Sequence, residues 1–80
     1  MNIKPRTYYK EYIDEDENVY YIMYTCTTVV YEIARINNNQ IYKNDEKIRW
    51  GTIKEWQEYI KNRRYTVKKI SNADLFLELL

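Results

Sequence analysis

The segment 19–26 constrains the fold more than any other part of the chain, because it lacks the apolar–polar alternation of a strand that faces solvent. Its sequence, Val-Tyr-Tyr-Ile-Met-Tyr-Thr-Cys, is rich in the β-branched and aromatic residues that favour strands. A strand that is apolar on both faces is covered on both sides of its sheet, here in part by amphipathic tyrosines. We therefore expect residues 19–26 to form a central strand.

Three more segments have the composition of strands. Residues 6–13 are dominated by aromatic and β-branched side chains, and residues 65–70 alternate as a strand does. Residues 28–36 fit either a strand or a helix with one apolar face. The run Thr-Thr-Val-Val favours the strand, because β-branched side chains are restricted in helices. Both interpretations of residues 28–36 stay open at the level of sequence.

Polar segments between the strands mark turns. The acidic run 14–18 separates the first two strands, and the asparagines at 37–39 tolerate a left-handed backbone. Residues 43–46 predict a second tight turn, between short strands at 40–42 and 47–50. The sequence therefore predicts a meander of short antiparallel strands.

Capping boxes predict where two helices begin. Thr52 and Glu55 have the spacing at which a hydroxyl and a carboxylate satisfy each other's backbone amides, so we expect a helix over about 53–63. Ser71 and Asp74 repeat this spacing before a short C-terminal helix, over about 72–80. The expected fold is α+β, a small antiparallel sheet of four or five strands with one packed helix and this terminal helix.

The chain of 80 residues predicts a single domain, 1–80, with a thin core that a second copy or a partner would help to cover. Its last residues are apolar around more than one face of the terminal helix. The residues concerned are Leu75, Phe76, Leu79 and Leu80. We expect Phe76 and at least one of these leucines to be buried, against the sheet or against a second copy in a homodimer.

The residue types needed for most catalytic sites are scarce. Histidine is absent, Cys26 is the one cysteine, and Ser71 is the one serine and occupies a cap position. Neither a Ser-His-Asp triad nor a Cys-His pair can be assembled from this set. A single glycine, Gly51, cannot build a loop that cradles phosphate. We therefore expect no enzyme and no bound cofactor.

No metal site is expected either. Zinc and iron sites need histidine or several cysteines. Asp14, Asp16 and Asn18 copy the first three ligands of a calcium-binding EF-hand loop, but Val19 and Thr25 stand where that loop needs glycine and glutamate. The acidic run is interpreted as a solvated turn. The lone Cys26 and the absence of a long apolar run predict a cytoplasmic protein that is neither inserted in a membrane nor secreted.

Charge is unevenly distributed along the chain. Residues 1–36 carry four basic and six acidic side chains, whereas residues 37–80 carry nine basic and six acidic ones. The molecule is therefore expected to have an acidic end and a basic end. The segment 61–69 concentrates five of the cations, with Tyr65 among them, which would suit a nucleic-acid-binding module. The alternative is a helix terminus followed by a solvated strand face.

Ten tyrosines are too many to bury on so small a domain, so several rings are expected at the surface, where they favour binding. The sequence predicts a small non-enzymatic inhibitor or accessory protein, of phage or mobile-element origin by its size and composition, that covers a surface of a protein partner. A nucleic-acid-binding module is the alternative. The candidate partner-binding residues are Tyr8, Tyr12, Asp14, Glu15, Asp16, Glu17, Lys61, Arg63, Arg64, Tyr65, Lys68 and Lys69.

Overall fold

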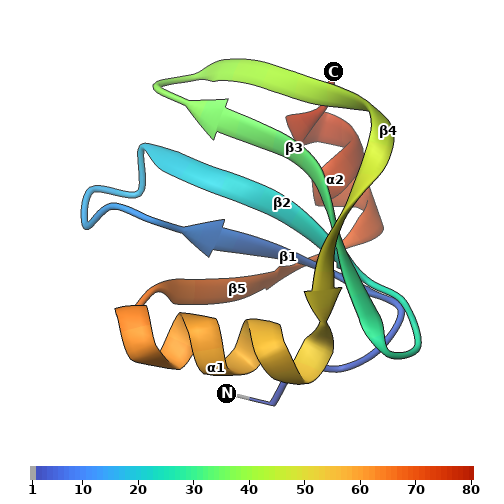
Figure 1. Cartoon of the computed structure of the whole chain (residues 1–80). Coiled ribbons are helices and arrows are strands. Elements are labelled where there is room, and N and C mark those ends of the chain that lie inside the picture. Colours follow the sequence, from blue (N-terminus) through green and yellow to red (C-terminus); the bar gives the residue numbers. More distant parts are fainter. Residues whose placement is uncertain (1) are drawn as a thin grey trace.

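A computed structural model describes residues 2–80 and has a five-stranded antiparallel sheet with two helices (Figure 1). This arrangement confirms the expected α+β fold. In chain order the elements are β1 (Thr7–Tyr12), β2 (Val19–Thr25), β3 (Val29–Asn37), β4 (Gln40–Thr52), α1 (Ile53–Arg63), β5 (Thr66–Ile70) and α2 (Asn72–Glu78).

The strands lie in the order β4-β3-β2-β1-β5, so β2 is the central strand, as the sequence predicts. The first four strands form a meander, and each is antiparallel to its neighbour. Helix α1 then carries the chain from β4 at one edge to β5 at the other, where β5 pairs with β1 (Figure 1). The N-terminal and C-terminal strands of the sheet are thereby joined side by side.

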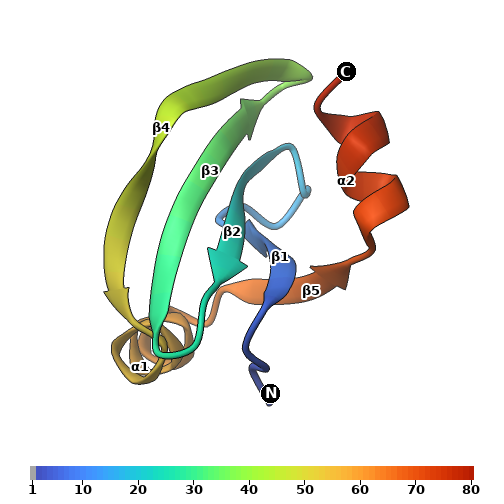
Figure 2. The same ribbon diagram turned by 90° about the vertical axis from the view of Figure 1, so that its right-hand side faces the viewer.

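Each face of the sheet carries its own hydrophobic cluster, and each cluster is covered by one helix. On the first face, called the α1 face, Tyr9 and Met23 pack beneath Trp56 of α1, which is fully buried. On the opposite face, the α2 face, Ile22 packs in a cluster that Leu79 of α2 covers in part. Figure 2 shows the two helices on opposite sides of the curved sheet. Alternation along β2 produces this division, because neighbouring residues of a strand point to opposite faces.

A β-bulge in β3 changes which residues reach each face. Met23 of β2 pairs with Glu32, and the adjacent Ile22 pairs with Ala34, so Ile33 is an extra residue in β3. An extra residue reverses the alternation of the side chains that follow it. Val30 consequently lies in the cluster of the α1 face, whereas Ala34 lies in that of the α2 face. The segment 28–36 is therefore a strand, but with its apolar residues divided between two cores.

The predicted tight turn at 43–46 is wrong. Residues 40–52 form the single strand β4, and residues 44–47 bulge out opposite Ile33 instead of reversing the chain. β4 is an edge strand whose side chains are mostly exposed. Polar residues are therefore as compatible with this strand as they are with a turn. The turn at 37–39 is confirmed, with Asn38 and Asn39 at φ angles of 49° and 71°.

Both helices begin where the capping signals predict. The Thr52 hydroxyl accepts a hydrogen bond from the Glu55 backbone N–H at 3.1 Å, and the Glu55 carboxylate accepts one from the Thr52 backbone N–H, also at 3.1 Å. Helix α1 ends at Arg63, and the next residue, Arg64, adopts the left-handed conformation of a helix C-cap. The Ser71 hydroxyl accepts from the backbone N–H of Asp74 and starts α2.

Candidate functional site

Helix α2 is attached to the sheet through a small number of contacts. Leu75 and Leu79 pack against the cluster of the α2 face and are half-buried. The Glu78 carboxylate accepts hydrogen bonds from the Lys10 ammonium and, at 2.7 Å, from the Tyr20 hydroxyl. Burial opposes the charge on Glu78, but the two hydrogen bonds and the positive charge of Lys10 together outweigh it and lower the pKa of this carboxyl. These contacts orient the helix and determine which of its residues remain exposed.

The outer side of α2 presents large apolar side chains to solvent. Phe76 and Leu77 are each 67% exposed, and Leu80 is 78% exposed. The expectation that Phe76 is buried against the sheet is therefore wrong, because its half-buried neighbours Leu75 and Leu79 take the inward positions. Burial of Phe76 against a second copy of the chain, the other expectation, stays a prediction.

This exposed surface continues onto the sheet. Leu77 and Leu80 line a groove of about 580 Å³ together with Ile41 of β4. Leu80 also lines a second groove of about 500 Å³, in which Phe76 is the other large exposed side chain. We call Ile41, Phe76, Leu77 and Leu80 the apolar surface. Two lysines that form no ion pair within residues 2–80, Lys43 and Lys69, line these grooves at its margin.

The acidic turn and the basic segment lie side by side, so the expectation of an acidic end and a basic end is wrong. Antiparallel pairing of β1 with β5 places the start of β5 next to the end of β1, where the acidic turn begins. Glu17 accepts a hydrogen bond from Lys68 at 2.8 Å. Asp14 and Glu15 line a cleft of about 380 Å³ that Arg63 and its neighbour Arg64 also line. Acidic and basic side chains therefore share this region of the surface.

Within the acidic turn, Asp14 has a structural role. Its two carboxylate oxygens accept backbone hydrogen bonds from Asn18, at 3.2 Å, and Val19, at 2.9 Å. Side-chain hydrogen bonds of this kind hold a tight turn in place of backbone pairing. Asp16 is exposed beside it. Within residues 2–80, no group of three or more histidine, cysteine, aspartate or glutamate side chains is arranged to hold a metal ion.

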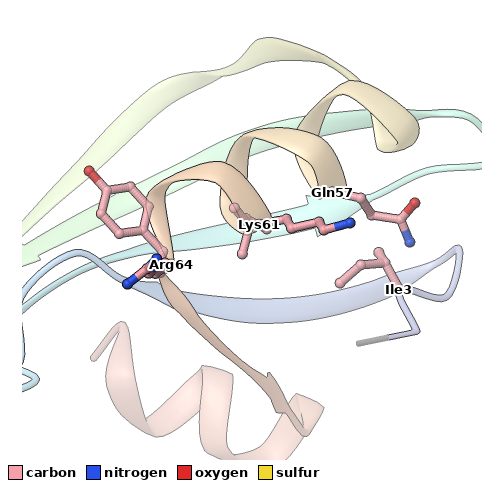
Figure 3. A pocket seen from close by; sticks show the side chains of 6 residues that line it. Ile3, Gln57, Lys61 and Arg64 are labelled. Carbon is pink, nitrogen blue, oxygen red and sulfur yellow. The ribbon is translucent and has the colours of Figure 1, made fainter.

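The five cations of the basic segment are divided among several grooves, and none of these grooves is lined by all five. Lys61 and Arg64 line a cavity of about 470 Å³ with Tyr65 and Ile3 at the end of α1 (Figure 3). The Arg63 guanidinium instead stacks over the ring of Tyr59, 4.1 Å from its centroid. On β5, Lys68 lies over Tyr12 and is paired with Glu17 of the acidic turn, and both Lys68 and Lys69 line the groove beside α2, away from the cavity at the end of α1. A path for a nucleic-acid backbone would need these charges along one line.

The tyrosines are less exposed than their number suggests. Tyr12, a candidate for partner binding, is buried in the core with Tyr9 and Tyr20, and the other candidate, Tyr8, is half-buried. Tyr42 is the one exposed tyrosine of the ten, with 47% of its surface accessible, and the others are buried or half-buried. Many of the rings contact one another or lie beneath the charged group of a lysine or arginine. The cation contacts are those of Lys10 with Tyr20, Arg35 with Tyr42, Lys47 with Tyr24 and Tyr31, Arg63 with Tyr59, and Lys68 with Tyr12.

A small pocket on the α1 face was not identified from the sequence. It has a volume of about 120 Å³ and is lined by Glu11, Tyr21, Met23, Glu32, Trp50 and Tyr59. Glu11 is only 3% exposed, and burial is the main cause that raises the pKa of its carboxyl. One sequence signal was available, because Glu11 is two residues from the core residue Tyr9 and therefore points to the same face. We call this cavity the Glu11 pocket.

Comparisons with protein-family models, with curated proteins and with solved structures give no significant match to this chain. Neither helix in residues 2–80 is long and apolar enough to cross a membrane.

Proposed function

We propose that this chain is a small non-enzymatic protein that binds another protein through the apolar surface and covers a functional surface of that partner. The observation that carries the proposal is the exposure of Phe76, Leu77 and Leu80 on one helix. Exposed apolar side chains that form one continuous patch are characteristic of protein interaction sites. The patch belongs to a helix whose Glu78 accepts hydrogen bonds from Lys10 and Tyr20 of the sheet.

The margin of the apolar surface suggests what the partner looks like. Lys43 and Lys69 contribute positive charge at its edge, and neither forms an ion pair within residues 2–80. Interfaces commonly combine an apolar centre with a polar rim, and complementary charge at the rim steers association. A partner with an apolar groove bordered by carboxylates would fit this surface.

The scarcity of catalytic groups supports the non-enzymatic part of the proposal. The Ser71 hydroxyl caps α2, and Cys26 is a half-buried thiol. A role as an inhibitor or accessory protein of a phage or mobile element, acting in the cytoplasm, agrees with the small size and the single cysteine. The mechanism in that case is steric occlusion of the partner's functional surface.

The proposal can be tested by affinity capture from a cell extract with matched variants. The double variant Phe76→Ser, Leu80→Ser removes the centre of the apolar surface and should lose a captured protein that the wild type retains. Ile48→Ser is the control, because Ile48 is 52% exposed on β4 but lines neither groove beside α2. Both changes affect exposed positions, so both proteins should keep the melting temperature of the wild type within a few degrees.

A partner that both variants retain equally would contradict the proposed surface. Enrichment of nucleic acid rather than protein, lost when the extract is treated with nuclease, would instead favour a nucleic-acid-binding module. The charge at the margin gives a second check, since Lys43→Glu with Lys69→Glu should weaken capture and Lys54→Glu should not. Lys54 is exposed on α1, on the other side of the sheet.

A further inference from the structure

The lining of the Glu11 pocket includes two carboxylates, those of Glu11 and Glu32, that form no ion pair within residues 2–80. The Oε1 atom of Glu11 accepts a hydrogen bond from the indole Nε1–H of Trp56 at 2.6 Å. Glu32 comes from β3, and its Oε2 atom accepts a hydrogen bond from the Asn44 side chain at 3.0 Å. Within residues 2–80 neither carboxylate forms an ion pair, and the charge of Glu32 adds to the rise in the pKa of Glu11. The pocket is therefore short of positive charge.

Irregularities in two strands bring these groups together. The bulge at Ile33 turns Glu32 to the α1 face, where it lies across from Met23. In β4 the bulged residues 44–47 place Asn44 where it donates to both the Glu32 carboxylate and its backbone carbonyl. Bulges occur often beside functional sites, where they redirect side chains. Both of these bulges border the Glu11 pocket, as does a third irregularity at Trp50 of β4.

The walls of the pocket are aromatic. Trp50 is an extra residue in β4, because Arg49 pairs with Tyr31 and Gly51 pairs with Val30. Its ring meets that of Tyr59 edge to face, with centroids 5.2 Å apart, and Tyr21 lines a further side. Aromatic faces attract cations through their negative quadrupole. Tyr59 already has the guanidinium of Arg63 over its ring.

We propose that the Glu11 pocket binds an alkylammonium group, with the carboxylates of Glu11 and Glu32 as counter-ions and the rings of Trp50, Tyr59 and Tyr21 as its walls. The cavity of about 120 Å³ exceeds the space that a single water needs and suits a compact cationic head group. This site lies on the α1 face, so the inference does not depend on the proposed role of the apolar surface. The source of the cation is a free small amine or the lysine side chain of a protein.

The test uses the whole protein with isotope-labelled nitrogen and follows the indole resonances by NMR. The chain has two tryptophans, so it has two such signals, and Trp50→Leu assigns them. Addition of n-butylammonium should shift the Trp56 signal saturably, because the cation meets the carboxylate to which this indole is bonded. Butanol is the neutral analogue and should not produce the shift. Absence of a saturable shift, or an equal shift with butanol, would overturn the proposal.

Two variants separate a binding role from a structural one. Glu32→Gln should weaken n-butylammonium binding about tenfold, because one counter-charge is lost. The same change relieves repulsion with Glu11, so the melting temperature should stay equal or rise. Glu46→Gln is the matched control, an exposed carboxylate of β4 outside the pocket, and should bind as the wild type does. Equal binding by Glu32→Gln and the wild type would contradict the proposal.

A second arm of the titration identifies the source of the cation. The probe is a short blocked peptide with one lysine between alanines, compared with n-butylammonium and with the same peptide carrying a neutral norleucine. Tighter binding of the lysine peptide than of n-butylammonium would support a protein lysine as the ligand. Tighter binding of n-butylammonium would support a free small amine. Equal shifts with the lysine and norleucine peptides would overturn the cation site.

Discussion

The indole Nε1–H of Trp56 donates a 2.6 Å hydrogen bond to the buried carboxylate of Glu11, and this bond joins α1 to β1 across 45 residues of sequence. Trp56 is fully buried and Glu11 is 3% exposed, so neither group has ready access to water. A buried polar group that loses its partner costs about 1–3 kcal/mol, which makes the pair interdependent. The bond also determines which way Glu11 faces in its pocket.

The raised pKa of Glu11 predicts that Glu11→Gln increases the free energy of unfolding by an amount that depends on pH. In the wild type, the folded state holds the Glu11 proton above the ordinary pKa of 4.5, so its contribution to stability is full at lower pH. That contribution is lost as pH rises through the raised pKa. Glutamine still accepts the bond from Trp56 and carries no charge. Near neutral pH we expect Glu11→Gln to raise the free energy of unfolding by on the order of 1 kcal/mol.

Denaturant unfolding at several pH values measures this difference, and Glu11→Leu is the control. Leucine removes the charge but leaves the indole N–H without an acceptor, so this variant should be about 1–3 kcal/mol less stable than Glu11→Gln. A gap between wild type and Glu11→Gln that is the same at every pH would show that Glu11 does not titrate abnormally. Other shifted groups, such as Glu78, are common to the proteins compared and cancel in the difference.

Leu79→Ala should destabilise the protein more than Phe76→Ala does, although leucine is the smaller side chain. Leu79 is half-buried against the α2 face, and its truncation should cost about 1–2 kcal/mol. Phe76 is 67% exposed, so its truncation should change the free energy of unfolding by less than about 0.5 kcal/mol. Thermal melts of the two variants make the comparison. A larger loss for Phe76→Ala that depends on protein concentration would indicate that Phe76 is buried in a homodimer.

Calcium and zinc are not expected to stabilise the protein. Both carboxylate oxygens of Asp14 are engaged by the backbone of the turn, so they are poorly placed to bind a metal. Melts in calcium, zinc and EDTA should agree within about two degrees. Asp14→Ala should lower stability by about 1 kcal/mol in all three, through the loss of the turn. A metal-dependent rise in the wild type that Asp14→Ala abolishes would reveal a site in the acidic turn.

Nucleic-acid affinity should be negligible at physiological salt. Lys68 is paired with Glu17, Arg63 is stacked on Tyr59, and acidic side chains line the cleft beside Arg64. Fluorescence anisotropy with single-stranded and duplex oligonucleotides at two salt concentrations is the measurement. Glu17→Gln provides a useful comparison, because freeing Lys68 should increase any residual binding at low salt. Tight oligonucleotide binding with a steep dependence on salt would show that the cations of the basic segment bind nucleic acid jointly.

Much of the fold could be predicted because its signals are local. The central strand 19–26 differs in composition from every other segment, and Thr52 and Glu55 satisfy each other within one turn of helix. The prediction of a turn at residues 43–46 is wrong because an exposed edge strand can contain the same polar residues, asparagine and aspartate, as a turn. Nothing local distinguishes the two cases, since the difference depends on whether β4 continues to pair with β3.

The candidate site was harder to predict, because it depends on register and on contacts between distant residues. The bulge at Ile33 divides the apolar residues of β3 between two faces, and a sequence with apolar residues at both phases is compatible with several registers. The pairing of Glu11 with Trp56 follows from the crossing of α1 over the sheet. The exposure of Phe76 depends on which side of a short apolar helix meets the sheet, and Glu78 helps to decide this through Lys10 and Tyr20.

Site-specific photo-cross-linking in cells tests the proposed interface most directly. A photoreactive phenylalanine derivative replaces Phe76 in one protein and Ile48 in another, and both positions are exposed. The account predicts that the probe at position 76 joins the chain to a different protein, and that the probe at position 48 does not. Two results for the probe at position 76 would contradict a partner-binding role for the apolar surface: no cross-link, or a cross-link only to a second copy of this chain. A cross-link to the partner protein from position 48 but not from position 76 would contradict it as well.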